Sequence, residues 1–217
     1  DVYKRQLNAQ CPAVPSPYTE NLSGGALPIC WQQSATSGDG WKFSGTPGYA
    51  AANNGRPAGT FAWVDFSGTD AGTVMEVIPV DVSSNTSPQI EFDFFCFNTT
   101  QPTPTNILHI EANDGTNWVS VATIQNNTFN GWSPYTYSLV GFDVNGVVNV
   151  RFRAESGGAT NDFYNDILVD NVAIREAPTC PSPLLSSFGV SILTANSAEL
   201  NWLCLLYTSP SPRDPNR

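Results

Sequence analysis

The stretch QIEFDFFCF, Gln89–Phe97, decides the fold, because apolar residues recur at every second position along it. The side chains of a β-strand point alternately to the two faces of a sheet. One face of this strand therefore carries only Ile90, Phe92, Phe94 and Cys96. The opposite face carries two carboxylates followed by two phenylalanines, so part of that face is covered as well. These two faces predict a sheet that packs against a second layer.

Similar alternation recurs between turns rich in Gly, Asn, Pro and Ser, which is typical of a sandwich or a barrel. The clearest turn is Asn113–Asn117, where Asp-Gly separates two alternating runs and predicts a hairpin. No stretch shows a helical period. We expect an all-β jelly-roll β-sandwich of two antiparallel sheets. The expected strands are residues 60–66, 73–80, 89–97, 106–112, 118–124, 135–140, 147–154 and 166–175.

The charge of the chain is low in density and acidic in balance. Only 13% of the residues are charged, and the formal net charge is −10. Lys and Arg are not clustered, which argues against a nucleic-acid partner. No apolar run approaches the roughly 20 residues of a membrane helix, which argues against membrane insertion. An acidic surface of this kind suits either simple solubility or Ca²⁺, a cation that prefers carboxylate and carbonyl oxygens.

The five cysteines include no CxxC pair and no spacing typical of a zinc site. Structural disulfides in an oxidising compartment and free buried cysteines are both compatible with this pattern. The sequence alone leaves the pairing open.

Catalytic motifs are incomplete. Glu91 and Asp93 lie on one face of the expected strand, as in lectin-like glycosidases, but no third carboxylate follows them. The single histidine, His109, lies on another expected strand and is interpreted as a solvated side chain. There is no Gly-x-Ser-x-Gly elbow and no His-Glu-x-x-His motif. We therefore predict that the protein is not an enzyme.

Aromatic side chains near turns are candidates for sugar binding, because flat rings stack on pyranose rings. Trp118, Trp132 and Tyr135 occupy such places and are the predicted ligand-binding residues. Trp31, Trp41 and Trp63 are instead expected in the core, as is usual for aromatic residues in strands.

Several short motifs stand in order along the chain: Tyr18–Gly25 (YTENLSGG), Cys30-Trp31, Gly38–Trp41 (GDGW), Gly59–Ser67 (GTFAWVDFS), Ile78–Ser83 (IPVDVS) with Pro88–Phe92 (PQIEF), Val150–Arg153 (VRFR) and the closing Asp166–Val172 (DILVDNV). Together they resemble the MAM domain and the related adhesin-type jelly-roll modules of secreted bacterial proteins. The resemblance covers residues 16–176. It departs from the family at Leu22, where a Phe is usual, and in the cysteine pattern.

The resemblance implies a structural Ca²⁺ that joins the first and last strands. Matched residue by residue, the ligands are Glu20 in the opening motif and Asp170 in the closing one, with Asp39 and Asp65 as further candidates. Carboxylates that converge at such a seam repel one another unless a cation neutralises them.

The extent of the resemblance, together with changes in composition along the chain, defines the expected domain organisation. We expect an N-terminal extension over residues 1–15, a jelly-roll domain over 16–176 and a Pro-rich linker over 177–183. Residues 184–203 resemble the first two strands of a fibronectin type III domain. Residues 1–6 and 204–217 break with the rest in composition, and we expect both to be processing scars.

Two functions are predicted. The first is a non-catalytic adhesion or interaction module of a larger secreted or surface protein, which binds a protein or a glycan at the cell exterior. The alternative is a carbohydrate-binding module attached to a secreted hydrolase. A fold by itself does not identify the ligand, so both stay open at this point, as does the oligomeric state.

Overall fold

The structure, a computed structural model, describes residues 11–47, 59–67, 72–96, 106–125, 131–158, 162–178, 189–193 and 198–201. Strands dominate these residues, and the one helical segment among them is the short 3-10 helix η1 (Asp162–Tyr164). No helix in the described part of the chain is long and apolar enough to cross a membrane. The chain divides into two compact units, Asp1–Ala177 and Pro178–Arg217.

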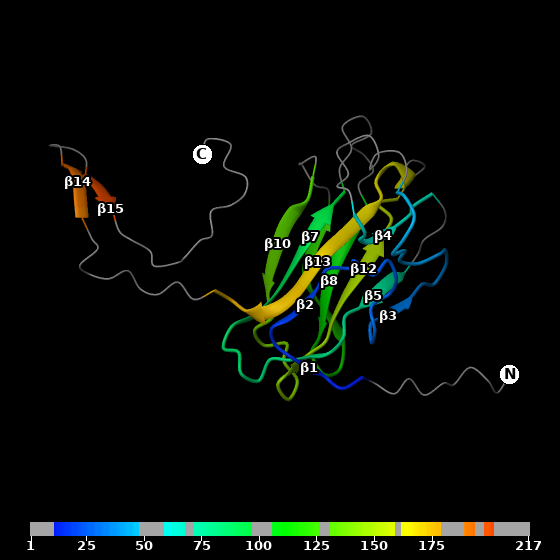
Figure 1. Cartoon of the computed structure of the whole chain (residues 1–217), viewed down its shortest axis with the longest axis horizontal. Helices are drawn as coiled ribbons and strands as arrows, with labels where there is room; N and C mark the ends of the chain where they lie inside the picture. Colours follow the sequence, from blue (N-terminus) through cyan, green and yellow to red (C-terminus); the bar gives the residue numbers. More distant parts are fainter. Residues whose placement is uncertain are drawn as a thin grey trace. The chain divides into compact units, whose positions relative to one another are not determined.

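The first unit is built from two five-stranded sheets (Figure 1). One sheet has the order β10-β7-β13-β2, and β4 also pairs with β13. All of its pairings are antiparallel. Its strands are β2 (Tyr18–Glu20), β4 (Ala62–Val64), β7 (Pro88–Phe95), β10 (Ser133–Ser138) and β13 (Ile167–Glu176).

The second sheet has the order β3-β5-β12-β8-β9 and is also antiparallel throughout. In Figure 1 it lies behind the sheet that contains β13. Its strands are β3 (Gln32–Ser34), β5 (Thr73–Glu76), β8 (Ile107–Asn113), β9 (Trp118–Gln125) and β12 (Val150–Glu155). The predicted all-β sandwich of two antiparallel sheets is therefore confirmed.

A third, small sheet was not predicted. It has the order β1-β6-β11, and its β1–β6 pairing is parallel. Two-residue strands leave too short a run for an alternation pattern to be recognised. The strands are β1 (Val14–Pro15), β6 (Val80–Asp81) and β11 (Val147–Val148).

The core fills the space between the two large sheets. Ile90, Phe92 and Phe94 of β7 are buried, as the alternation predicts. From the other sheet, Phe152 of β12 meets Phe92 edge-on, with ring centroids 5.0 Å apart. The mixed face of β7 is covered as well, because Phe95 belongs to a smaller apolar cluster with Phe61, Trp63 and Leu168. Trp31, Trp41 and Trp63 are all buried, as expected.

The predicted hairpin forms between β8 and β9. The Asp114 carboxylate accepts hydrogen bonds from the backbone N–H groups of Thr116 and Asn117, and Gly115 adopts a φ of +97°. Only glycine adopts such a backbone at no steric cost. The turn therefore ends with Trp118 as the first residue of β9.

The second unit contains a two-stranded antiparallel sheet of β14 (Gly189–Leu193) and β15 (Ala198–Asn201). Both strands fall within residues 184–203, for which a strand pair was predicted. The fibronectin type III resemblance of this segment stays a prediction.

Candidate functional site

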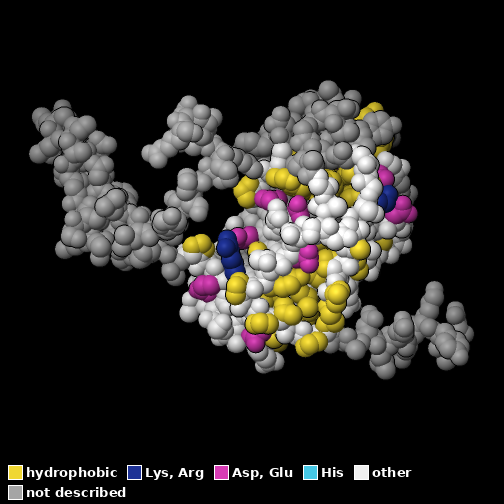
Figure 2. Space-filling model, viewed as in Figure 1, with side chains coloured by type: hydrophobic (Ala, Val, Ile, Leu, Met, Phe, Trp, Pro, Cys, Tyr) yellow, Lys and Arg dark blue, Asp and Glu magenta, His cyan; other side chains and the backbone are white. Residues whose placement is uncertain are grey.

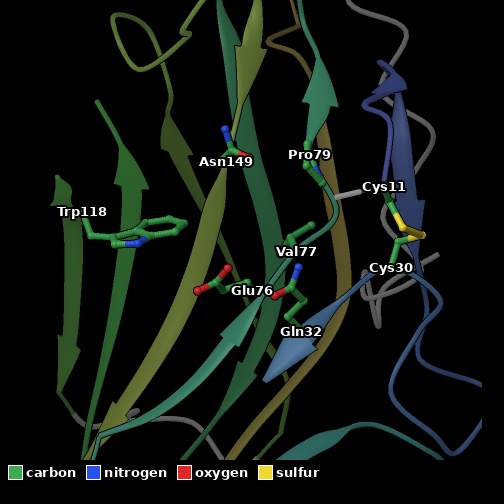
Figure 3. A pocket seen from close by; sticks show the side chains of 8 residues that line it. All are labelled: Cys11, Cys30, Gln32, Glu76, Val77, Pro79, Trp118 and Asn149. Carbon is green, nitrogen blue, oxygen red and sulfur yellow. A yellow bond between two sulfur atoms is a disulfide. The ribbon is translucent and has the colours of Figure 1, made fainter. Parts of the chain in front are cut away.

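A polar pocket of about 280 Å³ lies where strands of the second sheet meet the N-terminal segment (Figure 3). Trp118, the first residue of β9, lies on one side of it, and the Cys11–Cys30 disulfide lies on the opposite side. Between them are residues from three strand ends. They are Gln32 at the start of β3, Glu76, Val77 and Pro79 at and after the end of β5, and Asn149 between β11 and β12.

Three hydrogen-bonding side chains face this pocket without a protein partner. Within the described part of the chain, the side chains of Gln32, Glu76 and Asn149 make no hydrogen bond and no ion pair. Polar groups that the protein leaves unpaired in a concave site are available to orient a ligand. None of the three was predicted as a site residue, because they come from segments far apart in sequence.

Trp118 is held in place by an ionic network on the outer face of the second sheet. The Arg151 guanidinium lies over the Trp118 ring, 4.3 Å from its centroid. Arg151 Nε donates to Glu111 Oε2 at 2.6 Å, and Arg153 Nε donates to the other oxygen at 3.0 Å. Burial opposes ionisation of Glu111, but the two arginines outweigh it and hold the pKa of this carboxyl below its ordinary value. The network restrains the indole before any ligand arrives.

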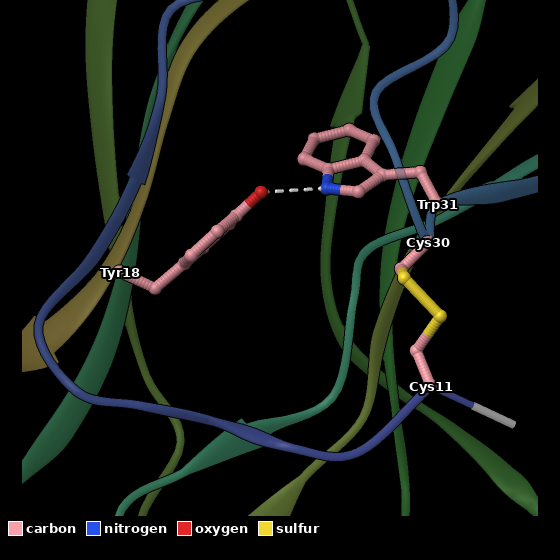
Figure 4. The surroundings of a disulfide bond; sticks show 4 residues. All are labelled: Cys11, Tyr18, Cys30 and Trp31. Atoms are coloured by element: carbon pink, nitrogen blue, oxygen red, sulfur yellow. Dashed lines mark hydrogen bonds between the residues drawn. A yellow bond between two sulfur atoms is a disulfide. The ribbon is translucent and has the colours of Figure 1, made fainter.

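The disulfide fixes the other wall of the pocket (Figure 4). Cys11 is bonded to Cys30, and the next residue, Trp31, donates from Nε1 to the Tyr18 hydroxyl at 2.8 Å. This places the segment before β1 against the start of β3.

Of the other cysteines, Cys96 is free and buried, and burial raises the pKa of its thiol to about 12. Cys180 and Cys204 lie outside the described residues.

The three predicted ligand-binding aromatics lie in three different places. Trp118 lines the pocket. Trp132 packs edge-on against Phe61, with ring centroids 5.7 Å apart, in the cluster beside the other sheet. Tyr135 stacks on Phe92 at 6.0 Å and packs against the main core, where burial raises its pKa. The structure therefore brings only Trp118 together with the unpaired polar groups.

Glu20 and Asp170 lie close to the seam between the first and last strands of the first sheet. β2 pairs directly with β13, with Glu20 opposite Val172. Asp170 lies opposite Asp93 of β7, just before a bulge at which Asn171 adopts a φ of +50°. Burial, with repulsion from Asp93 and Glu20, raises the pKa of Asp170 to about 6. The two predicted residues thus interact, and Asp93 joins them.

Asp39 and Asp65 occupy a different environment. Both carboxylates bind Lys42 Nζ, at 3.3 Å and 3.0 Å respectively. Asp65 directly follows β4, whose last residue, Val64, lies opposite Ile167 of β13. At about 3.3 Å per residue, Asp65 is more than 10 Å from the level of Asp170 along that strand. The four predicted metal ligands therefore do not form one cluster.

The carboxylate oxygens of Glu20, Asp93 and Asp170 at the seam meet the needs of a metal ion only in part. Glu20 Oε1 accepts from the Leu22 N–H, and Asp93 Oδ2 accepts from Asn171 Nδ2. One oxygen of each carboxylate remains for other ligands. Among the residues that the structure describes, no three side chains of His, Cys, Asp or Glu are grouped so that they could hold a metal ion. An open pocket next to this seam is lined by Thr19–Asn21 and Asn171–Ala173.

Replacing Asp170 with asparagine is expected to stabilise the protein at neutral pH in buffer containing EDTA. Because the pKa of Asp170 is higher in the folded state than its ordinary 3.8, the ionised carboxylate destabilises the fold above about pH 6. That cost disappears as the pH falls towards 4. After discounting for solvent screening, we expect a gain of about 1 kcal/mol at pH 7.5. Urea unfolding at pH 7.5 and pH 4 measures it, with the exposed Asp143→Asn as control.

Glu91, the carboxylate considered above for glycoside hydrolysis, already has an ion-pair partner. Glu91 forms a two-pronged ion pair with Arg175, with Nε–Oε1 and Nη2–Oε2 distances of 2.9 and 2.5 Å. A carboxylate held in this way is a poor proton donor or nucleophile.

His109 is hydrogen-bonded to Glu155 at 2.9 Å and to Thr123 at 3.2 Å, so it is less solvated than expected. Figure 2 shows no cluster of basic side chains on the face it displays.

Comparison with known proteins identifies the fold alone. No family model matches the chain, and no curated protein matches it either. Among solved structures, the K1 cleaved adhesin domain of Lys-gingipain from Porphyromonas gingivalis W83 is similar, with a TM-score of 0.55 and 16% identity. That match covers 75% of this chain and 99% of the other. The carbohydrate-binding module TmCBM61, solved with β-1,4-galactotriose, has a TM-score of 0.51 and 10% identity over 72% and 94% of the two chains.

Proposed function

We propose that the jelly-roll unit is a non-catalytic binding module that recognises a glycan in the pocket beside Trp118. The observation that supports this most is the set of unpaired groups on Gln32, Glu76 and Asn149 next to an aromatic ring. Sugars present hydroxyl groups that both donate and accept, and their C–H faces are apolar. A ring and a set of amide and carboxylate groups are complementary to that combination.

The aromatic ring in this pocket is already ordered. Arg151 contacts the Trp118 ring, and Glu111 holds Arg151. A side chain that is restrained before binding loses less conformational entropy when the ligand arrives. Trp118 is therefore the residue that we expect to contribute most to affinity.

A binding screen tests the proposal. The first ligand is β-1,4-galactotriose, followed by neutral and acidic oligosaccharides, each measured by calorimetry with the full chain. We expect at least one to bind, and Trp118→Ala to weaken it at least about 30-fold, as for a binding hot spot. Asn149→Ala is a second variant that should also weaken binding, and it should fold normally because this side chain has no partner in the described ranges. Trp132→Phe is the matched control and should bind normally. Failure of every glycan, or full affinity in Trp118→Ala, contradicts the proposal.

The site is the same for both functions predicted from the sequence. An adhesion module and a carbohydrate-binding module beside a hydrolase differ in the rest of the protein, not in this pocket. We propose that the module acts outside the cell, because a disulfide such as Cys11–Cys30 persists in an oxidising compartment.

We also propose a structural calcium at the seam of β2 and β13, held by Glu20 and Asp170. The support is the repulsion of Asp170 by Asp93 and Glu20, which a divalent cation would relieve. Asp39 and Asp65 are not included, because both bind Lys42 and Asp65 lies away from this seam.

Calcium is expected to raise the melting temperature by about 5–10 °C at 100 times its Kd. Asp170→Asn should abolish this rise. Asp65→Asn is the matched control and should keep it. A midpoint that is the same in calcium and in EDTA contradicts the proposed ion.

A further inference from the structure

Glu76 is the only charged side chain that lines the pocket among the described residues. It is the last residue of β5, and its carboxylate is half-buried and has no partner in the described part of the chain. An ionised carboxylate accepts several hydrogen bonds and donates none. It is therefore suited to a ligand that presents neighbouring O–H groups.

The basic residue opposite Glu76 on the neighbouring strand already has partners of its own. Arg151 is the cross-strand neighbour of Glu76, yet its Nε is bonded to Glu111 and its guanidinium lies over Trp118. Glu111 is shared with Arg153, and Arg153 also binds Glu155 at 2.9 Å. The positive charges on this face are thus neutralised by its own carboxylates. No Lys, Arg or His belongs to the described lining of the pocket.

An anionic ligand would be repelled here. A carboxylate or sulfate group next to the Glu76 carboxylate would meet a like charge in a partly desolvated site, and the neighbouring cation, Arg151, is already ion-paired with Glu111. The net charge of −10 adds repulsion at longer range. Neutral hydroxyls meet no such cost, and each hydroxyl that donates to the carboxylate forms a charge-assisted hydrogen bond.

We propose that Glu76 is the specificity-determining residue of this site, and that it selects uncharged glycans with adjacent hydroxyl groups and rejects uronates and sulfated sugars. This inference rests on the proposed glycan-binding function and adds the class of ligand. Gln32 and Asn149 lie on either side of Glu76 in the pocket and supply both donors and acceptors (Figure 3).

The test uses matched neutral and anionic probes with the full chain. The neutral probes are hexasaccharides of glucose, galactose, xylose and mannose, and the anionic probes are hexagalacturonate and a sulfated heparin hexasaccharide. Calorimetry on the wild type is expected to show binding of at least one neutral probe, with every anionic probe at least tenfold weaker. Glu76→Gln keeps the shape of the side chain, and it should fold normally because the Glu76 side chain has no partner among the residues that the structure describes.

Glu76→Gln is expected to weaken binding of the neutral probe roughly 10- to 100-fold, as for the loss of hydrogen bonds to a charged group. It should also reduce the ratio of the affinity for the neutral probe to the affinity for the anionic probes. Asp143→Asn removes the same charge from an exposed side chain that does not line the pocket, and it should change neither quantity. Equal binding of neutral and anionic probes by the wild type, or an unchanged ratio in Glu76→Gln, overturns the role of Glu76 while glycan binding stands. If the wild type binds none of the probes, glycan binding itself is overturned.

Discussion

Phe92→Ala is expected to lower the free energy of unfolding by about 3–5 kcal/mol, as for other large-to-small changes in a close-packed core. Phe92 is 2% exposed and joins the two sheets. Its ring meets Phe152 of the opposite sheet edge-on at 5.0 Å and stacks on Tyr135 at 6.0 Å. Alanine would remove these ring contacts and leave a cavity between the layers.

Urea unfolding of the full chain measures this effect as a lower midpoint with an unchanged slope. Phe92→Leu, which refills most of the space, should lose less than half as much. Val140→Ala changes an exposed side chain and should stay within about 0.5 kcal/mol. A loss below about 1 kcal/mol in Phe92→Ala would mean that this ring does not join the sheets.

Asn106→Leu is expected to cost about 2–4 kcal/mol. Asn106 is fully buried just before β8 and holds the segment between β12 and β13. Its Nδ2 donates to the carbonyls of Asp162 and Asn165, at 2.9 and 2.7 Å, and its Oδ1 accepts from the Gly157 N–H at 2.9 Å. Leucine has a similar volume but removes all three hydrogen bonds, at about 0.5–1.5 kcal/mol each. The Asp162 and Asn165 carbonyls each keep one other donor, the Asn165 N–H and Cys96 Sγ respectively.

Hydrogen exchange at the Gly157 amide reports the loss directly and should become faster in Asn106→Leu. Ser156→Ala is the control, because it removes two neighbouring hydrogen bonds of a partly exposed side chain, from Ser156 Oγ to Asp162 and from the Gly158 N–H to Ser156 Oγ, and should cost only about 1 kcal/mol. Unchanged stability together with unchanged exchange at Gly157 would contradict the structural role of Asn106.

The layers of the fold could be predicted from the sequence, because alternation and turn chemistry are local. The pattern of Gln89–Phe97 predicts the buried face of β7, and Asp114-Gly115 predicts the β8–β9 turn. Strand ends were less accurate. The run 60–66 contains a strand only at Ala62–Val64, and the strand expected at 135–140 starts at Ser133 and ends at Ser138. Ends depend on which neighbour the backbone pairs with.

The candidate site was harder to predict, because it depends on contacts between distant segments. Trp118 was named for its position at a turn, but Gln32 and Glu76 meet it only after β3, β5 and β9 have joined one sheet. A local signal did exist for Asp39. Lys42 follows it by three residues, and the two form an ion pair. In a segment that is not helical, however, a spacing of three residues does not by itself predict this contact.

Nuclear magnetic resonance of the full chain, titrated with the tightest oligosaccharide from the screen, tests the central claim most directly. If the pocket binds the glycan, the indole N–H of Trp118 and the side-chain amides of Gln32 and Asn149 shift together and saturate at one Kd. The indole N–H of Trp132 should stay in place. Stationary signals in the pocket together with a shift at Trp132 would show that the ligand binds elsewhere and would contradict the claim.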